Sequence, residues 1–367
     1  MLQIIAKQTS KQTIRFMAVA IMVAGVAACN DDDSETVFTP VPTYGEYGTE
    51  TALTLARDYS GRYMGSSTEL AAAQYMKRRM TFGNNGNKVI LQPFTFVPSR
   101  GLFANQSITS QNVVVTHKGT QNTGRTLYVG AHYDSATQYP NYIDLQGLDD
   151  NASGSGVLSE LVSHFNGVNT ADTIKFVAFG SEEGGLQGSK AFVESLSQDE
   201  IDNAIGMINL DSLLTGDNMY ANAGDNSYDN AGNEIAANVK LRDAALRIAN
   251  KLNIGLQKNP AIIPPGETEP YKPAGVGCCS DQESFDNIMP VVAFEATNWS
   301  LGPDFDGYTQ TDNPKIPNGY SWHNPDVDNE AVLTQALGEE RITQRMSAYA
   351  QIITQLIAEQ VKAESVR

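Results

Sequence analysis

Six apolar segments constrain the fold most, because each has the length and composition of a buried strand. They are KVILQPFTF (88–96), QNVVVTHKG (111–119), RTLYVGAHYDS (125–135), TIKFVAFGSEEGG (173–185), AIGMINLDSLL (204–214) and VVAFEA (291–296). Runs rich in β-branched and aromatic residues between turn residues are typical of strands. Two of them, 173–185 and 204–214, begin apolar on both faces, which suits a central sheet covered by helices on both sides.

Stretches with apolar residues three or four positions apart precede, separate and follow these strands, and they predict helices. The expected helices are 50–61, 67–83, 156–165, 186–196, 235–253 and, as one or two helices, 330–363. The second has a capping residue available in Ser66, Ser67 or Thr68. Strands that alternate with helices indicate an α/β layered fold with a largely parallel sheet.

The N-terminal segment has the layout of a secretory signal rather than of a domain. Three basic residues precede an apolar run, FMAVAIMVAGVAA (16–28), that is too short to span a bilayer. The last residues before Cys29 form VAAC, which resembles the lipobox of bacterial lipoproteins. This resemblance implies that Cys29 becomes the lipidated first residue of a periplasmic protein anchored in the inner or outer membrane. An ordinary cleaved signal with an incidental cysteine is the alternative.

The expected domain organisation follows from composition. It comprises a signal peptide (1–28), a flexible tether (29–45) that is acidic, contains proline and lacks periodicity, and one folded domain (46–367). Its two cysteines, Cys278 and Cys279, are adjacent, so they form either a vicinal disulfide or two free thiols. The formal charge of −17 and the lack of a basic block argue against nucleic acid as a partner and favour a cationic substrate.

Polar side chains follow three of the predicted strands at the point where each strand ends. His132 and Asp134 follow one, Glu182 and Glu183 the next, and Asp211 the third, while Asp149 and Asp150 open a helix. Ligands in open α/β sheets bind beyond the carboxyl ends of the strands. So many carboxylates in one place repel one another unless a multivalent cation is bound, and histidine with aspartate or glutamate is the ligand set of catalytic zinc. Of the four histidines, His117 and His164 are expected to be structural or exposed, and position alone leaves His323 undecided.

Five ordered motifs, GAHYDS, GLDDNASGSG, SEEGGLQGS, NLDS and SWHN, resemble those of the zinc aminopeptidases related to bacterial leucyl aminopeptidase. The resemblance runs from about residue 47 to the C-terminus. Within that family, GCCSDQESFD, VVAFEATNWSLG and SWHNPDVDN are most similar to the branch of aminopeptidases that convert alkaline phosphatase isozymes. It implies the zinc-dependent exopeptidase fold, a three-layer α/β/α arrangement with a mixed, mainly parallel sheet.

The same resemblance implies a role for each site residue and two zinc ions per chain. His132 and Asp211 would bind one zinc, Glu183 and His323 the other, and Asp150 would bridge them. Asp134 would orient His132, and Glu182 would be the general base. A cis peptide bond is expected between Asp150 and Asn151, with Asn151 or Ser153 capping the following helix and Gly154 and Gly156 allowing it to pack closely.

The expected activity is removal of N-terminal residues from peptides or proteins outside the cytoplasm. The isozyme-conversion resemblance and the acidic chain favour basic residues such as arginine, with Glu267, Glu269, Asp281 and Glu283 as candidate specificity residues. Three alternatives remain: a carboxypeptidase, a glutaminyl cyclase of the same fold, and a binding lipoprotein without catalysis. The motifs contain no arginine to hold a substrate carboxylate, and all five ligand positions are filled.

Overall fold

The computed structural model describes residues 43–82, 88–99, 101, 103–137, 144–263, 268, 272–301 and 309–364. The signal peptide, Cys29 and most of the expected tether lie outside the described residues, as do Glu267 and Glu269. No helix among the described residues combines the length and apolar content needed to cross a membrane.

The described strands form one eight-stranded mixed sheet with the order β1-β2-β4-β3-β5-β8-β6-β7. Their bounds are β1 (Lys88–Phe96), β2 (Ile108–His117), β3 (Thr126–His132), β4 (Thr173–Phe179), β5 (Ala204–Leu210), β6 (Asn218–Asn222), β7 (Leu256–Lys258) and β8 (Val291–Thr297). Strands β4, β3, β5 and β8 are parallel neighbours, and β6 is parallel to β7. The pairs β1–β2, β2–β4 and β6–β8 are antiparallel.

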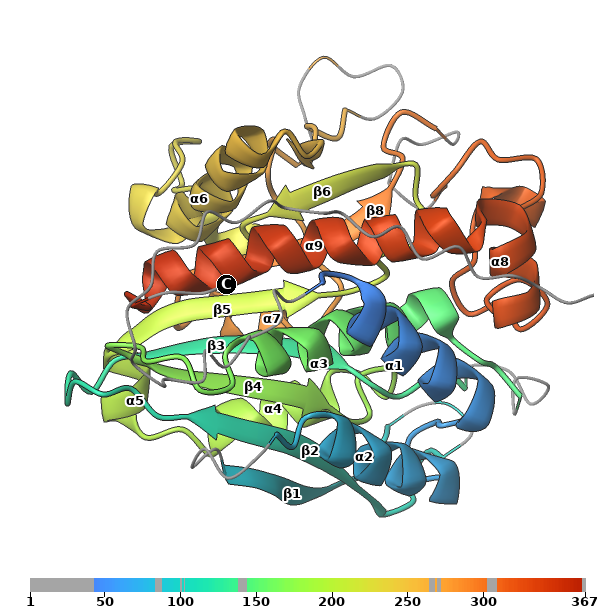
Figure 1. Ribbon diagram of the computed structural model, residues 1–367, viewed down its shortest axis with the longest axis horizontal. Helices are drawn as coiled ribbons and strands as arrows, with labels where there is room; N and C mark the ends of the chain where they lie inside the picture. Colours follow the sequence, from blue (N-terminus) through green and yellow to red (C-terminus); the bar gives the residue numbers. More distant parts are fainter. Residues whose placement is uncertain are drawn as a thin grey trace, which may run out of the picture. The chain divides into compact units, whose positions relative to one another are not determined.

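Helices cover both faces of this sheet (Figure 1). The larger apolar cluster holds side chains of α1 (Glu46–Asp58), α2 (Ser67–Arg79), α3 (Gly154–His164), α6 (Ala236–Leu252) and α9 (Glu339–Gln360). On the other face, α4 (Gln187–Glu194) and α7 (Glu283–Asp286) contribute to a smaller cluster. Two further helices are α5 (Gln198–Asp202) and α8 (Glu330–Leu337). This confirms the three-layer α/β/α fold with a mixed, mainly parallel sheet.

Alternation along the central strands decides which side chains reach the site. On β3, Leu127 and Val129 join the larger cluster while Tyr128 joins the smaller one. Because successive side chains of a strand point to opposite faces, His132 lies on the face of the smaller cluster. At the carboxyl ends of the parallel strands, this face is therefore where polar groups gather.

Glycines let α3 approach its neighbours, as the sequence predicts. A Cβ atom on Gly156 would lie 2.4 Å from the carbonyl oxygen of Gly48 in α1, and one on Gly154 would lie 2.5 Å from that of Leu210. The second helix is capped by Ser66, whose Oγ accepts a hydrogen bond from the Glu69 backbone at 2.9 Å. The segment 330–363 forms two helices, which break at Gly338, where φ is +88°.

The sequence analysis does not predict four short elements, namely α5, α7, β6 and β7. Strand β6 has the sequence NMYAN and β7 only LQK, so neither has an apolar run. Pairing with β8 sets the position of β6, and pairing with β6 sets that of β7. Strand propensity depends on such tertiary neighbours more than on local sequence.

Candidate metal centre

The loop that precedes α3 carries the central carboxylate of the site. The peptide bond between Asp150 and Asn151 is cis, which confirms the expectation. The Asn151 side chain caps α3, since its Oδ1 accepts from the Gly154 backbone at 2.8 Å, and its Nδ2 donates to the Leu210 carbonyl at 2.8 Å. Asn151 therefore fixes Asp150 against the end of β5.

Asp149, whose role the sequence does not reveal, is a buried structural carboxylate. It accepts hydrogen bonds from the Leu214 backbone at 2.7 Å, from Gln310 Nε2 at 2.8 Å and from Ser321 Oγ at 2.8 Å. Burial raises its pKa, and these donors oppose that rise. Asp149 thus ties the loop before α3 to the loop that carries His323.

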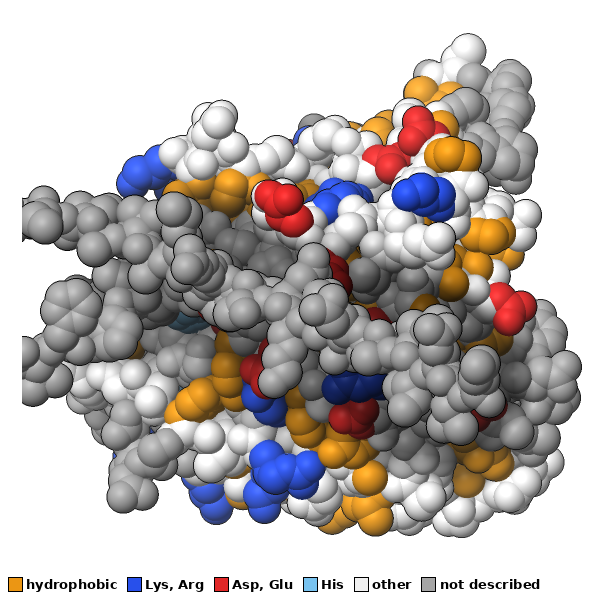
Figure 2. Space-filling view, turned by 45° about the vertical axis from the view of Figure 1, so that its right-hand side comes forward, with side chains coloured by type: hydrophobic (Ala, Val, Ile, Leu, Met, Phe, Trp, Pro, Cys, Tyr) orange, Lys and Arg blue, Asp and Glu red, His pale blue; other side chains and the backbone are white. Residues whose placement is uncertain are grey.

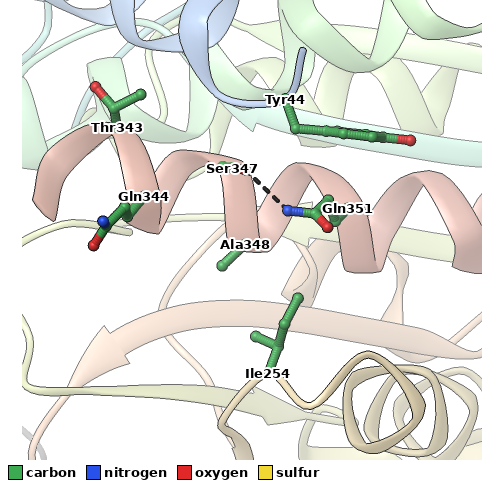
Figure 3. A pocket seen from close by; sticks show the side chains of 7 residues that line it. All are labelled: Tyr44, Ile254, Thr343, Gln344, Ser347, Ala348 and Gln351. Carbon is green, nitrogen blue, oxygen red and sulfur yellow. Dashed lines mark hydrogen bonds between the residues drawn. The ribbon is translucent and has the colours of Figure 1, made fainter. Parts of the chain in front are cut away.

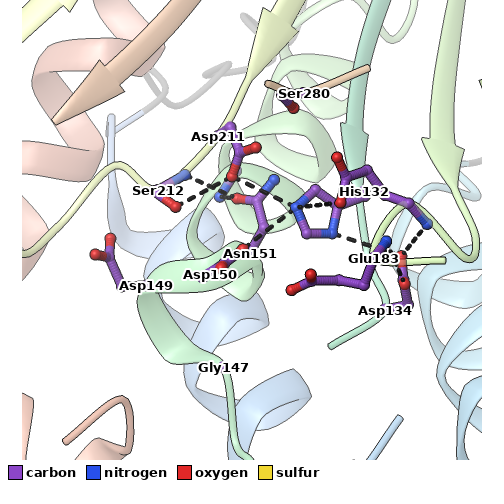
Figure 4. Close-up of polar contacts among 12 residues, drawn as sticks. His132, Asp134, Gly147, Asp149, Asp150, Asn151, Glu183, Asp211, Ser212 and Ser280 are labelled. Atoms are coloured by element: carbon purple, nitrogen blue, oxygen red, sulfur yellow. Dashed lines mark hydrogen bonds and ion pairs between the residues drawn. The ribbon is translucent and has the colours of Figure 1, made fainter. Parts of the chain in front are cut away.

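The five predicted ligands converge into two groups that share Asp150. His132 Nε2 lies 3.3 Å from Asp150 Oδ1 and 3.4 Å from Asp211 Oδ1. His323 Nε2 lies 3.3 Å from Asp150 Oδ2 and 3.1 Å from Glu183 Oε2. Figure 4 shows His132, Asp150 and Asp211 turned toward one another. The two oxygens of Asp150 thus face two different histidines, which is the arrangement of a bridging carboxylate.

These donor groups fit two zinc ions. Each group, His132 with Asp150 and Asp211 and His323 with Asp150 and Glu183, brings one imidazole and two carboxylates within 4.8 Å of one another. Glu183 Oε1 is buried and has no hydrogen-bond partner among the described residues. Nitrogen and oxygen donors in this combination are those of catalytic zinc sites.

The pKa values of the cluster residues also indicate that the site favours positive charge. Glu183 and Asp150 raise the pKa of His323 to about 12. Burial would lower the pKa of His132, but Asp211 and Glu182 raise it well above its usual value. Burial raises the pKa of Glu182 well above its usual value, and the neighbouring Glu183 charge adds to the rise. In the absence of metal, protons on these side chains would supply the positive charge that bound cations would otherwise provide.

Asp134 is buried next to the ligand cluster and lies between His132 and the backbone of Glu182 and Glu183. Its Oδ1 is 3.5 Å from His132 Nδ1 and accepts from the Glu182 backbone at 2.9 Å. Its Oδ2 accepts from the Glu183 backbone at 3.2 Å. Asp134 therefore holds the backbone of the glutamate pair and lies next to the outer imidazole nitrogen of His132.

Three buried charged residues that support the site were missed by the sequence analysis. Arg62 donates from Nε to the Tyr133 carbonyl, from Nη2 to the Gly147 carbonyl at 2.8 Å and from Nη1 to that of Gln146. It thereby joins the loop after β3 to the loop before α3. Its neighbours in sequence, SGRYMG, give no signal of this role.

The other two are carboxylates that hold backbone segments next to ligands. Asp328 accepts from the backbones of Asp149 at 2.6 Å and Asp150 at 3.1 Å. Glu69 accepts from Ser110 Oγ at 2.7 Å and Ser181 Oγ at 2.8 Å, and burial raises its pKa to about 8. Asp328 lies in the motif SWHNPDVDN, so only a partner 178 residues away could reveal its function.

The other two histidines lie away from the ligand groups. His117 is buried, with its ring 6.4 Å from that of Phe165. His164 is also buried, with Nε2 3.3 Å from Glu160 Oε1 in the preceding turn of α3. Both therefore have structural surroundings, as the sequence analysis expects.

A cavity of about 1110 Å³ opens over the ligand cluster. Its lining includes Glu182, Glu283, Glu295 and the adjacent cysteines Cys278 and Cys279, which the structure pairs as a vicinal disulfide. Burial raises the pKa of Glu295 to about 7.

Asp281, a predicted specificity residue, is fully buried and does not line this cavity. Burial raises its pKa to about 7, and the nearby charges of Asp134 and Asp211 add to the rise. Of the two candidate specificity residues that the structure describes, Glu283 lines the cavity and Asp281 does not.

A second hollow of about 340 Å³ lies on the outer side of α9 (Figure 3). Its lining residues are Tyr44, Ile254, Thr343, Gln344, Ser347, Ala348 and Gln351, none of which is charged. Over the face in Figure 2, acidic and basic side chains are interspersed. Of these two cavities, the large one brings titratable groups together.

The sequence matches the model of peptidase family M28 over residues 112–347. The chain is 32% identical over 339 residues to the alkaline phosphatase isozyme conversion protein of Escherichia coli, covering 88% of this chain and 92% of the relative. It is 38% identical over 114 residues to an aminopeptidase of Bacillus subtilis, a match that covers 31% of this chain and 23% of that protein.

Solved structures share the fold at lower sequence identity. A zinc aminopeptidase from Bacillus subtilis superposes with a TM-score of 0.63 at 16% identity, over 88% of this chain and 96% of that one. A glutaminyl cyclase from Porphyromonas gingivalis superposes with a TM-score of 0.61 at 14% identity, over 87% and 99% of the two chains. The fold alone therefore does not separate these two activities.

Proposed function

The chain belongs to peptidase family M28 and is a metallopeptidase, and on that premise we propose that it is a two-zinc aminopeptidase acting outside the cytoplasm. The observation that carries this proposal is the shared carboxylate: Asp150 presents one oxygen to His132 and the other to His323. Each side is completed by a further carboxylate, Asp211 or Glu183. A site for one ion would not need a bridge of this kind.

The chain's own residues account for binding and proton transfer in this proposal. Zinc, when bound, would polarise the scissile carbonyl and lower the pKa of water. Glu182 lines the cavity beside the ligands, with Oε2 4.0 Å from His132 Nε2. It would accept a proton from the attacking water and return it to the leaving amine. Asp134 would keep Glu182 in place through the backbone hydrogen bond that it accepts.

The cavity also weighs against the alternatives. A carboxypeptidase needs a cation for the substrate carboxylate, but Lys272, the only lysine or arginine among the described lining residues, is 2.8 Å from Asp225. A glutaminyl cyclase would be expected to have a single-metal site, whereas two ligand groups are present here. A protein that only binds would have no need of Glu182 next to a complete ligand set.

A substrate panel tests this function. We expect the purified, zinc-loaded chain to release N-terminal residues from peptides with a free α-amino group and not from the same peptides after N-acetylation. The control is the C-terminal amide of each peptide, which should be cut at the same rate. Cyclisation of N-terminal glutamine without hydrolysis, or loss of cleavage on C-terminal amidation, would contradict the proposal.

The proposed substrates are chains with a basic N-terminal residue such as arginine. The similar protein of Escherichia coli is described as converting alkaline phosphatase isozymes, and the formal charge of −17 favours cationic partners. Comparing kcat/KM for arginine and leucine p-nitroanilides tests this preference, and a clear advantage for leucine would contradict it.

The proposed location is the periplasm, with the chain held to a membrane by a lipid on Cys29. The basis is the sequence VAAC behind a basic and apolar leader. We expect Cys29→Ser to move the protein from the membrane fraction to the soluble periplasmic fraction with its specific activity unchanged. Wild-type protein that is already soluble in the periplasm would refute the lipid anchor.

A further inference from the structure

Glu295 is a cavity carboxylate that none of the site roles above uses. It lies on β8 next to the metal ligand Asp211 at the end of β5. Two backbone hydrogen bonds bracket it: Asp211 N to Phe294 O at 3.0 Å and Ala296 N to Ser212 O at 2.9 Å. Glu295 is therefore the cross-strand neighbour of Asp211, and adjacent strands are about 4.8 Å apart.

The Glu295 side chain points to the same face of the sheet as the ligands. Phe294 belongs to the larger apolar cluster, and side chains alternate along a strand, so Ala293 and Glu295 point to the other face. All three residues contribute atoms to the cavity lining. Asn259 Nδ2 donates to Glu295 Oε1 at 2.7 Å, which holds the carboxylate in one orientation. The acid is thus partly buried, fixed and open to the cavity.

No described cation of the cavity pairs with Glu295. Lys272 lines the cavity but pairs with Asp225 at 2.8 and 3.1 Å. Two zinc ions would balance the charge of their own ligands and not that of Glu295. Both tryptophans of the chain, Trp299 and Trp322, also line the cavity. A cavity that holds both a carboxylate and indole rings is a suitable environment for a guanidinium or ammonium group.

We propose that Glu295 is the specificity residue for the N-terminal side chain and that it selects arginine and lysine through a charge-assisted hydrogen bond. This inference rests on the proposed aminopeptidase function. In this proposal, a substrate whose first peptide bond lies over the zinc ligands would have its first side chain on the Asp211 side of the cavity. The long side chain of arginine or lysine then extends along the cavity to the carboxylate on β8.

Glu283 is the other unassigned cavity acid and provides the matched control. It is exposed, at the start of α7, and its Oε1 accepts a hydrogen bond from the Cys279 backbone at 2.6 Å. Glu283 thus lines the same cavity as Glu295, but it does not lie on a strand next to a proposed zinc ligand. Glu295→Gln and Glu283→Gln remove the same charge from two places in one cavity.

The test compares these variants in the zinc-loaded full chain. We expect Glu295→Gln to lower kcat/KM for arginine and lysine p-nitroanilides by about 10- to 100-fold, since hydrogen bonds to charged groups have this effect, and to change the leucine value less than about threefold. Glu283→Gln should leave the arginine-to-leucine ratio unchanged. Calorimetry should show that Glu295→Gln weakens binding of L-arginine but not of L-leucine, with zinc content unaltered.

A further variant distinguishes loss of the Glu295 carboxylate from a folding defect. Glu295→Asp keeps the charge but withdraws it by one methylene, so the arginine preference should fall only partly. Wild-type enzyme that prefers arginine, together with a Glu295→Gln variant that retains this preference, would overturn the assignment to Glu295. Wild-type enzyme that cleaves peptides but prefers leucine would overturn both the inference and the basic preference. Absence of any aminopeptidase activity would instead contradict the proposed function.

Discussion

Glu182→Gln should retain two zinc ions and lose most of its turnover. Glu182 lines the cavity and is the acid of the cluster that neither ligand group includes. Glutamine keeps the shape and the backbone hydrogen bond to Asp134, but it cannot accept the proton. Loss of a general base typically lowers the rate by about 10²–10⁴-fold. Single-turnover kinetics and metal analysis on the same sample check this result.

Glu183→Gln is the matched variant one residue away, and it should fail for a different reason. Its Oε2 lies 3.1 Å from His323 Nε2, inside the second ligand group. Replacing an anionic ligand by a neutral amide should lower zinc occupancy, and excess zinc should restore part of the activity. If Glu182→Gln is the variant that loses metal, or if it keeps a near-normal kcat, the roles of the two glutamates are reversed or wrong.

Arg62→Met should lower the stability of the fold strongly, although Arg62 belongs to neither ligand group. Arg62 is fully buried and donates to the carbonyl groups of Tyr133, Gln146 and Gly147. Methionine fills a similar volume but leaves these acceptors without a donor. Buried polar groups that lose their partners cost about 1–3 kcal/mol each, so we expect the free energy of unfolding to fall by about 3–5 kcal/mol.

Urea unfolding of the zinc-loaded protein measures this change. Arg62→Lys keeps the charge but cannot reach three separate carbonyls with one ammonium group, so its stability should be intermediate. Arg247→Met removes an exposed arginine that pairs with Glu359 and should have a much smaller effect. An Arg62→Met protein as stable as the Arg247→Met control would contradict the role of Arg62 as the link between the two loops.

Much of the fold can be predicted because its signals are local. The apolar runs that become β3, β4 and β5 are buried along nearly their whole length, and each is followed by the polar residues of the site. The rule that such residues meet at one edge of a parallel sheet then brings His132, Glu183 and Asp211 together. The family resemblance adds the cis bond at Asp150, which the structure confirms.

The supporting residues could not be predicted, because their partners are distant in sequence. Asp149 accepts from residues 214, 310 and 321, and Arg62 donates to carbonyls at 133, 146 and 147. A carboxylate or guanidinium with no local partner has the same sequence pattern as a solvent-exposed charge. Glu295 was missed for a related reason: only the position of β8 next to β5 places it beside Asp211.

The central claim is that activity needs two zinc ions held by groups that share Asp150. The most direct measurement is a titration of the metal-free chain with zinc while release of a free N-terminal residue is followed. We predict that activity reaches its maximum at two equivalents of zinc per chain, and that Asp150→Asn lowers zinc affinity at both positions. Full activity at one equivalent, or an Asp150→Asn variant that binds two zinc ions as tightly as the wild type, would contradict the account.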